Sequence, residues 1–280
     1  MVVGAIYKQD ANFDQFREIS GVMGFTGTGD RNVLAQLVKG GLCDNDWAVC
    51  MHERGRSNGT LTIGGVDPQL SAKGEMAYVP DVGGGEFWAV AAESLQLDNE
   101  TAFSLFSMFD GGRAILDICT NVLLLPTKAM SAVKRRMCAD ATHRPSCVEL
   151  WSGDCVALTE TAVAAFPDLS INLKGGVTLV MRSTDYLLQG SPLAATQGQY
   201  CLAIRDGGSA GGTGFIIGQT VGVCVCVCAR ARVFGFSKSG ISARLTVLGE
   251  TTMRNYYVVF DKGSQRVGWG QVDRNNCGNL

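Results

Sequence analysis

Histidine and proline are scarce in this sequence, and its apolar runs are short. Only two of its 280 residues are histidine, against eleven cysteines, and no Cys-x-x-Cys unit occurs. This composition argues against a zinc site built from Cys and His ligands, and we expect no metal and no other cofactor. No apolar run is long enough to span a bilayer, so no membrane anchor is evident.

Charge of neither sign dominates the chain. The formal net charge is −2, the pI is about 5.7, and 18% of the residues are charged. Nothing in this balance points to nucleic acid or to an acidic membrane surface as a partner. Glycine is abundant, with 36 residues, and 46% of the chain is hydrophobic. Short apolar segments separated by Gly, Asp, Asn and Ser predict a mainly β chain with a substantial core.

Two helices stand out from this strand-rich pattern. Residues 32–41 carry apolar side chains on one helical face and end in two glycines. Pro126 opens a second helix that extends to about Met137, because proline suits the first helical turn. A C-terminal hairpin is predicted from its β-branched and aromatic residues. We expect strands over residues 47–51, 60–63, 76–80, 87–93, 114–116, 121–125, 169–173, 177–181, 200–204, 256–260 and 266–269.

The cysteines and two glycosylation sequons indicate an oxidising, secretory compartment. The Asn-x-Thr sequons begin at Asn58 and Asn99, each in a polar, turn-like context. The chain shows no signal peptide, since only Val2 to Tyr7 separate Met1 from Lys8, too few for an apolar region and a cleavage site. We therefore expect the natural N-terminus to lie upstream.

One stretch does not fit a folded core. Residues 221–227 alternate valine with glycine or cysteine, and Ala-Arg-Ala-Arg follows soon after. Such low complexity resembles a translated dinucleotide repeat. We interpret residues 221–246 as an insert from an unremoved intron, which a transcript joining Thr220 to Val247 would confirm. The alternative is an irregular surface loop, although long unstructured loops inside compact domains are uncommon.

The motif that carries chemistry is centred on Asp117. This residue follows the apolar segment 114–116 and precedes Ile118-Cys119-Thr120 and a further apolar segment. Val247-Leu248-Gly249 comes much later, followed by the apolar, aromatic segment 253–261. This order resembles the C-terminal lobe of pepsin-like (family A1) aspartic peptidases. There a strand delivers a catalytic Asp into an Asp-Thr/Ser-Gly turn, and an apolar-apolar-Gly strand packs beneath that turn.

The resemblance covers almost the whole chain apart from the insert. Residues 21–25 resemble the apolar-apolar-Gly element of the N-terminal lobe, with Gly24 as its glycine. Residues 61–67 resemble the inter-lobe segment, and residues 266–269 resemble the closing strand. The context of residues 124–126 and the position of Cys50 lean toward the beta-secretase, plant and protist branches of the family.

The resemblance also implies one disulfide. Cys155 and Cys201 fall where the family has a disulfide in its C-terminal lobe. Two other pairs lie at loop-scale separation, Cys138 with Cys147 and Cys43 with Cys50. The second of these has the difficulty that both residues can sit in or beside strands with diverging side chains. For Cys224, Cys226 and Cys228 we expect no native partners.

The implied architecture is the pepsin-like acid protease fold in two parts. Residues 1–79 are the remnant of the N-terminal lobe with the inter-lobe segment. Residues 80–280 form a nearly complete C-terminal lobe that includes the insert. We expect the remnant to have lost its sheet partners and to expose strand edges, which predicts poor solubility.

The implied activity is that of an aspartic-type endopeptidase. Two carboxylates about 3 Å apart share one proton, so that one activates water while the other hydrogen-bonds the peptide carbonyl. Asp117 is the catalytic candidate, and Thr120, Gly249 and Gly24 support the catalytic turns. The implied partners are peptide or protein substrates of a monomer, in the secretory or endomembrane lumen, a vacuole or the extracellular space.

Departures from the family pattern argue against activity of this chain. No Asp-Thr/Ser-Gly precedes Gly24, Ile118 replaces the hydroxyl residue, and Cys119 replaces the glycine. A lone Asp cannot form the shared-proton pair, and Cys119 adds strain of about 1–3 kcal/mol if the turn has a positive φ there. We therefore expect very poor hydrolysis.

Two alternatives to the peptidase remain. One is a non-catalytic, pepsin-fold binding or inhibitor-like protein that keeps the cleft and lacks the catalytic pair. The other is a homodimer that pairs two Asp117 turns, which the residual N-terminal lobe segments would obstruct. His52 and His143 are isolated in the sequence and receive no catalytic role.

Overall fold

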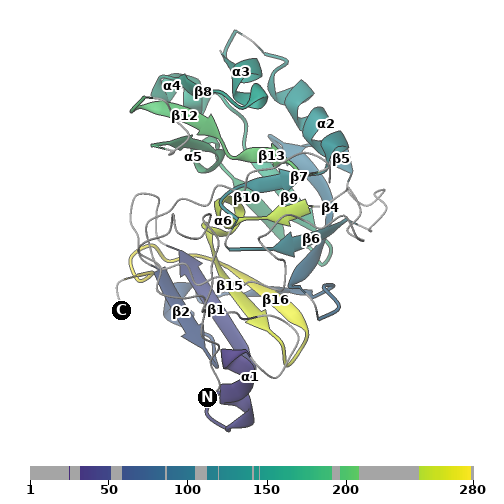
Figure 1. The fold of residues 1–280 in the computed structure, drawn as a ribbon, viewed down its shortest axis with the longest axis vertical. Coiled ribbons are helices and arrows are strands. Elements are labelled where there is room, and N and C mark those ends of the chain that lie inside the picture. Colours follow the sequence, from purple (N-terminus) through teal and green to yellow (C-terminus); the bar gives the residue numbers. More distant parts are fainter. Residues whose placement is uncertain are drawn as a thin grey trace, which may run out of the picture.

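The computed structural model describes residues 25, 32–51, 59–85, 87–104, 112–118, 120–140, 142–144, 146–190, 196–207 and 246–278. These residues fold into three β-sheets with short helices around them, so the predicted mainly β class is confirmed (Figure 1). In this part of the chain no helix combines the length and the apolar character needed to cross a membrane.

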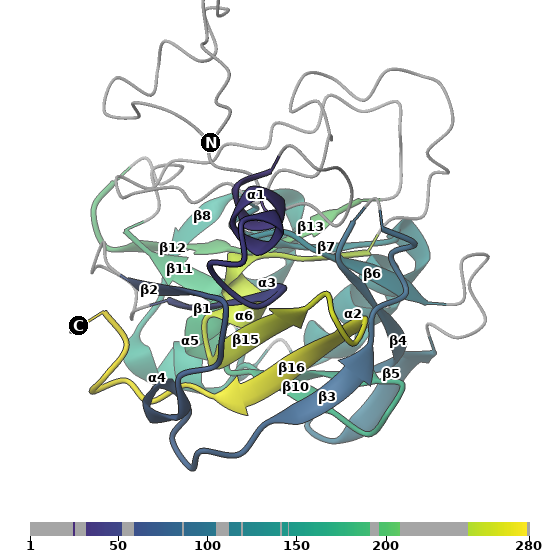
Figure 2. The same cartoon turned by 90° about the horizontal axis from the view of Figure 1, so that it is seen from below.

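A five-stranded antiparallel sheet joins the first part of the chain to its end. Figure 2 shows the C-terminal hairpin at its centre, with early strands on both sides. The expectation that the first part has lost its sheet partners is wrong for residues 46–51 and 59–63. The hairpin pairs with residues 46–49, and residues 59–63 pair with residues 47–51 on the other side. The strand order is β2 (Gly59–Ile63), β1 (Asp46–Met51), β15 (Tyr256–Asp261), β16 (Arg266–Gln271) and β3 (Ala77–Pro80).

A larger, eight-stranded sheet carries the Asp117 segment. Its interior strands have three to five residues each, except for one of nine, and they contribute many buried apolar side chains to the core. The order is β10 (Thr178–Met181), β9 (Leu169–Leu173), β4 (Ala89–Leu97), β6 (Arg113–Leu116), β14 (Thr246–Leu248), β7 (Leu123–Leu125) and β13 (Ile204–Asp206), with β5 (Glu100–Ser104) paired to β4.

A three-stranded sheet lies beyond the eight-stranded one (Figure 1). The predicted strand 200–204 divides here, because the chain leaves one sheet at Ala203 and enters the next as β13. The order is β11 (Leu187–Gln189), β12 (Gln199–Leu202) and β8 (Cys155–Ala157).

Both predicted helices are present. Helix α1 (Val33–Lys39) begins at Asn32, whose Oδ1 accepts a hydrogen bond from the Ala35 amide at 2.7 Å, and it ends at Gly40. Helix α2 (Thr127–Met137) starts directly after Pro126. The other helices are too short for a helical period to show in the sequence: α3 (Cys147–Ser152), α4 (Glu160–Ala164), α5 (Ser183–Tyr186), α6 (Glu250–Met253) and the 3-10 turn Pro68–Leu70.

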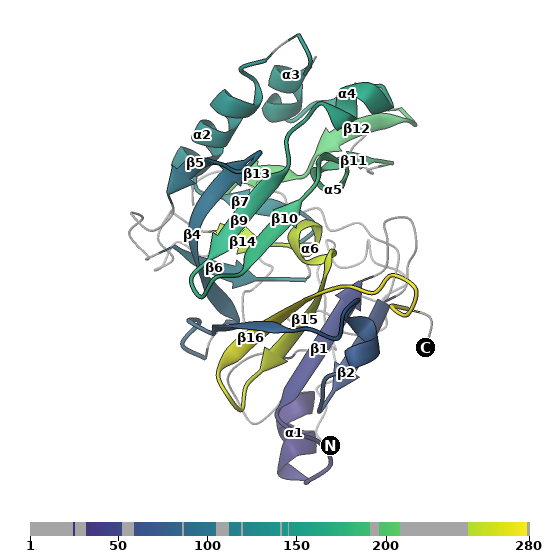
Figure 3. The same ribbon diagram turned by 180° about the vertical axis from the view of Figure 1, so that it is seen from behind.

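An aromatic cluster packs between the five-stranded sheet and the main core. Trp47 of β1 stacks on Phe260 of β15 with ring centroids 3.9 Å apart, and Phe25 lies 5.0 Å from Trp47. Trp88 meets Phe260 edge-on and donates its indole N–H to the Phe25 carbonyl at 3.1 Å. Residues from the start, middle and end of the chain thus share one core. Figure 3 shows β15 and β16 of the hairpin in the same sheet as β1 and β3, which flank them in the strand order.

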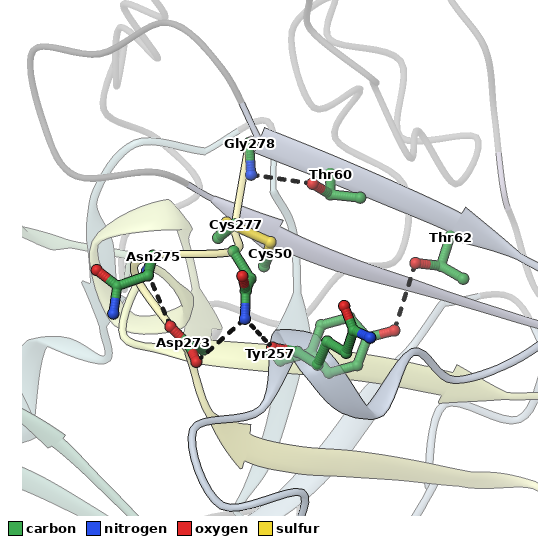
Figure 4. Close-up of a disulfide and its surroundings, with 10 residues drawn as sticks. Cys50, Thr60, Thr62, Tyr257, Asp273, Asn275, Cys277 and Gly278 are labelled. Carbon is green, nitrogen blue, oxygen red and sulfur yellow. Dashed lines mark hydrogen bonds between the residues drawn. A yellow bond between two sulfur atoms is a disulfide. The ribbon is translucent and has the colours of Figure 1, made fainter. Parts of the chain in front are cut away.

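The opposite face of the five-stranded sheet covers a second, smaller core. Cys50 of β1 lies within it and is bonded to Cys277, which corrects the candidate pairing of Cys43 with Cys50 (Figure 4). The chain after β16 turns at Asp273, whose Oδ1 accepts from the Asn275 amide at 2.8 Å, and this turn brings Cys277 back onto β1. Gly278 then donates to Thr60 Oγ1 at 3.0 Å.

The suspected insert 221–246 lies outside the described residues except at its last position. Thr246 is the first residue of β14 and pairs with Ala114 of β6. This pairing makes Thr246 part of the folded sheet, and the insert 221–246 stays a prediction.

Candidate active site

Asp117 lies where β6 ends, in a turn that crosses the end of β14. Strand β14 pairs in parallel with β6, with Val247 opposite Ile115, and antiparallel with β7, where Val247 meets Leu124. Because β14 runs between β6 and β7, the connection between those two strands must pass over the end of β14. The Asp117 turn is therefore placed directly against Leu248 and Gly249.

Backbone hydrogen bonds fix this crossing. The Asp117 amide donates to the Leu248 carbonyl at 3.2 Å, and the Thr120 amide donates to the Asp117 carbonyl at 3.2 Å. The Thr120 carbonyl accepts from the Glu250 amide at 2.6 Å. The turn is thus closed on itself and bonded at both ends to the segment that begins helix α6.

The Asp117 side chain is oriented by its neighbour in the turn. Thr120 Oγ1 donates to Asp117 Oδ2 at 2.7 Å, and the Thr120 side chain is buried while Asp117 is half-buried. A hydroxyl that donates to a carboxylate at this distance stabilises the ionised form and holds one oxygen in place. The structure therefore brings Asp117 and Thr120 together as a positioned, partly accessible carboxylate.

Gly249 is needed here for space rather than for an unusual backbone angle. Its φ is −83°, an ordinary value for any residue. A Cβ at this position would overlap the carbonyl oxygens of Thr120 and Val122. The close approach of Gly249 to these two carbonyls lets the turn lie flat on the end of β14.

A buried threonine adds a further contact that the sequence did not reveal. Thr251 of α6 is buried and donates its hydroxyl to the Asn121 carbonyl, one residue beyond Thr120. The sequence signal was only a hydroxyl residue two places after the apolar-apolar-Gly element. Helix α6 thereby holds the backbone that leads from the Asp117 turn to β7.

Several predicted site residues lie outside the described part of the chain. They are Gly24, Cys119 and Asn58. Phe25, the neighbour of Gly24, is described and is buried in the aromatic cluster. Ile118 is half-buried, and its side chain packs against the main core. Its apolar side chain brings no hydroxyl to the Asp117 carboxylate.

Asn99 lies at the exposed tip of the hairpin between β4 and β5. Asp98 and Asn99 have φ values of 49° and 68°, the left-handed conformation that tight two-residue hairpins require. Asn and Asp tolerate this conformation better than other non-glycine residues, so turn geometry alone explains the choice of residue. The exposure of Asn99 and Thr101 leaves the sequon accessible.

Two of the candidate cysteine pairs are bonded in the structure. Cys155 of β8 faces Cys201 of β12 in register, and their sulfurs are 1.99 Å apart. Cys138 and Cys147 join the end of α2 to the start of α3, at 2.02 Å. The first pair is the disulfide that the family resemblance implies.

The structure describes one of the two histidines, His143. The expectation that His143 stands alone is wrong, because its Nδ1 lies 2.9 Å from Asp140 Oδ2 in an exposed turn after α2. The hydrogen bond from the His143 side chain is the main cause that lowers the pKa of Asp140. His52 lies outside the described residues. Within the described ranges, His, Cys, Asp and Glu form no group of three that could hold a metal ion.

The sequence of this chain is similar to those of known proteins. The family model described as eukaryotic aspartyl protease matches residues 2–272. Pepsin A of Bos taurus is 21% identical over 277 residues, and pepsin A of Sus scrofa is 22% identical over the same length. Cathepsin E of Aquarana catesbeiana is 26% identical over 214 residues, which cover 76% of this chain and 41% of that protein. The two pepsin alignments cover 97% of this chain but only 61% and 59% of those proteins.

Proposed function

Since the family match extends over residues 2–272, this chain belongs to the eukaryotic aspartyl protease family, and we propose that it carries half of the catalytic site of an aspartic-type endopeptidase. We call Asp117, Thr120 and Gly249 the half-site. The single observation that supports the proposal best is the Asp117 carboxylate, held by the Thr120 hydroxyl in a turn that rests on Gly249. The implied substrates are peptides or proteins.

Each member of the half-site has a role in the proposed reaction. Asp117 shares a proton with a second carboxylate, because two carboxylates about 3 Å apart do not both ionise. The ionised partner takes a proton from water, and the protonated partner hydrogen-bonds the peptide carbonyl as water attacks it. Thr120 keeps Asp117 Oδ2 in place, and Gly249 allows the turn to lie in the position that this alignment needs.

Residues 1–280 by themselves hydrolyse peptides very poorly in this proposal. The sequence contains neither Asp-Thr-Gly nor Asp-Ser-Gly, the motifs that supply a catalytic carboxylate in this family. Residues 1–280 therefore offer no second carboxylate in the usual motif. Ile118 also stands where the family has a hydroxyl residue, with its side chain against the core. One carboxylate without its partner lacks the shared proton on which the chemistry depends.

The apolar Ile118 also supports a second candidate, a non-catalytic binding protein of the pepsin fold. The transcript upstream of Met1 discriminates between the two. An in-frame Asp-Thr/Ser-Gly, preceded by a signal peptide, would favour the peptidase. A transcript that starts at Met1 and encodes Cys119 would favour the binding protein.

The assignment of Asp117 is tested through the protein that the full transcript encodes. The peptidase proposal expects acid-dependent cleavage of a quenched peptide that disappears in Asp117→Asn, since the amide cannot share or transfer the proton. Thr178→Val, which changes an exposed strand residue, is a control that should leave cleavage unaltered. Cleavage that persists in Asp117→Asn would overturn the assignment.

The proposed location is the lumen of the secretory pathway, and the proposed division is an N-terminal lobe remnant, 1–79, followed by a C-terminal lobe, 80–280. Three disulfides in the described residues support an oxidising compartment. The exposed Asn99 supports glycosylation at the β4–β5 hairpin. Protein from a secretory host should lose mass on enzymatic deglycosylation, and Thr101→Ala should reduce that loss while keeping Asn99. An unchanged loss in Thr101→Ala would exclude Asn99 as a glycan site.

A further inference from the structure

Two aspartates face each other at one end of the five-stranded sheet. Asp46 begins β1, Asp261 ends β15, and the antiparallel register places them directly opposite one another. Directly opposite residues project from the same face of a sheet with Cβ atoms about 4.5–5.5 Å apart, and like charges in this arrangement are destabilising. The pair therefore lies across the junction between the first part of the chain and its C-terminal hairpin.

The positively charged neighbour of the pair, Arg266, bonds to Asp261 rather than to Asp46. Arg266 of β16 donates Nε to Asp261 Oδ2 at 2.7 Å, and its guanidinium covers the Tyr78 ring of β3. The Ser264 amide donates to Asp261 Oδ1 at 2.8 Å. In contrast, Asp46 Oδ1 is buried and has no hydrogen-bond partner among the described residues.

The remaining titratable neighbours do not compensate Asp46. Asp44, just before β1, adds a second negative charge, and the half-buried Cys43 thiol precedes it. Lys262 follows Asp261 in the hairpin turn, where its backbone amide donates to the Asn45 carbonyl at 3.1 Å. Strand β2 brings no ionisable side chain to this end of the sheet, since Ile63 and Gly64 occupy it.

The two carboxyl groups are consequently unequal. Burial, and then the charges of Asp261 and Asp44, raise the pKa of Asp46 above its ordinary value, against the weaker effect of backbone hydrogen bonds. Partial burial acts to raise the pKa of Asp261 as well, but hydrogen bonds from Ser264 and Arg266 outweigh it and lower that pKa. Asp46 is thus the member that binds the proton as the solution becomes acidic.

We propose that Asp46 and Asp261 form a pH-sensitive contact that holds β1 against the C-terminal hairpin more firmly in acid than at neutral pH. This proposal rests on the geometry of the sheet and does not depend on the proposed catalytic function. Protonation of Asp46 removes one of two facing charges and lowers the cost of its unpartnered, buried oxygen.

The direction of the effect on stability follows from proton linkage. The folded chain binds the Asp46 proton more readily than the unfolded chain does. The stabilisation is therefore complete below the ordinary aspartate pKa and is lost as the pH rises through the folded pKa of Asp46. Acid conditions tighten the junction between the two parts of the chain, and neutral conditions loosen it.

Urea unfolding at about pH 4 and about pH 7 tests the proposal in the complete chain, since these values bracket the titration of a raised aspartate. Asp46→Asn keeps the shape of the side chain and removes its charge. The Asp46 contact lowers the folded-to-unfolded ratio of the unaltered chain as the pH rises from about 4 to about 7. We expect the fall in this ratio to be about two- to fivefold smaller in Asp46→Asn, the size of effect that facing like charges produce. Asp154→Asn, an exposed aspartate before β8, is the matched control and should leave the loss unaltered. An Asp46→Asn variant with the wild-type loss would overturn the proposal.

A second measurement does not depend on the folding of Asp46→Asn. Carboxyl carbon NMR of the unaltered chain should give Asp46 a titration midpoint above the ordinary aspartate value of about 3.9. Asp261→Asn should move that midpoint downward, because it removes the facing charge. A midpoint for Asp46 at or below the ordinary value would overturn the proposal.

Discussion

At the scale of single residues, the contact between Thr120 and Asp117 matters most for the proposed chemistry. A carboxylate at the end of a strand can adopt several side-chain orientations, and a buried hydroxyl that donates to one oxygen removes that freedom. Thr120 is buried, so this bond lies largely away from solvent and contributes to the fold as well as to the site.

Replacement of Thr120 by valine tests this contact. Thr120→Val keeps the shape of the side chain and leaves Asp117 Oδ2 without this donor, and we expect a loss of about 1–3 kcal/mol in the free energy of unfolding. Thr178→Val removes an exposed hydroxyl that donates to Asn172 Oδ1, and it should cost less than about 1 kcal/mol. Urea unfolding of both variants gives the comparison. Equal losses would show that the Thr120 hydroxyl does not hold Asp117.

At the scale of secondary-structure elements, the site depends on three strands and one short helix. Strand β14 separates β6 from β7, and the Asp117 turn passes over its end, where helix α6 begins. Gly249 is the point at which these elements meet, and the backbone of the turn occupies the space that a side chain would need.

The Gly249 position therefore tolerates no side chain. Gly249→Ala should destabilise the fold by about 1–3 kcal/mol, because the added carbon overlaps two carbonyl oxygens and overpacking forces backbone shifts. Gly263→Ala is the matched control in the C-terminal hairpin turn. Its Cβ would lie 3.5 Å from Asp261 Oδ1, an ordinary contact, and the change should stay within about 0.5 kcal/mol. Thermal or urea unfolding that finds Gly249→Ala as harmless as Gly263→Ala would contradict the crossing described here.

The sequence predicted those elements whose signals are local. Strand β9 has the predicted bounds, Leu169–Leu173, because apolar residues alternate with polar ones there, between turn-forming residues on both sides. Helix α2 follows Pro126 as predicted. Helix α5 has only four residues, too few for a helical period, and its end merges with β11. Short elements of this kind form because tertiary packing selects them, so a local pattern does not reveal them.

The candidate site was predictable only in part, for a similar reason. Asp117, Thr120 and Gly249 follow from the order of motifs along the chain, and the structure places them in contact. The Thr251 hydroxyl reaches the Asn121 carbonyl only because β14 lies between β6 and β7, which no local pattern specifies. Cys50 has its partner 227 residues away, so its pairing could not be read from spacing.

At the scale of the whole molecule, the first part of the chain is joined to its C-terminal part by strand pairing and by a disulfide. The five-stranded sheet pairs β1 with β15, and the disulfide between Cys50 and Cys277 lies on the smaller core of that sheet (Figure 4). This closure explains how residues before the eight-stranded sheet can be ordered together with the C-terminal hairpin.

The long-range disulfide should therefore stabilise the fold more than the short one. The chain-entropy model gives about 5 kcal/mol for a loop as long as that of Cys50–Cys277 and about 2.5 kcal/mol for that of Cys138–Cys147. The sequence separations are 227 and 9 residues. Double alanine variants of each pair, compared by urea unfolding, measure the difference. A Cys50→Ala, Cys277→Ala variant that loses no more stability than the Cys138→Ala, Cys147→Ala variant would contradict this role.

We propose that Asp117 is one catalytic carboxylate and that residues 1–280 lack its partner. The decisive measurement is hydrolysis of a quenched peptide at acid pH by the purified chain, with and without pepstatin. We expect no pepstatin-sensitive turnover above that of Asp117→Asn, because one carboxylate cannot form the shared-proton pair. Pepstatin-sensitive turnover by the unaltered chain that disappears in Asp117→Asn would contradict it.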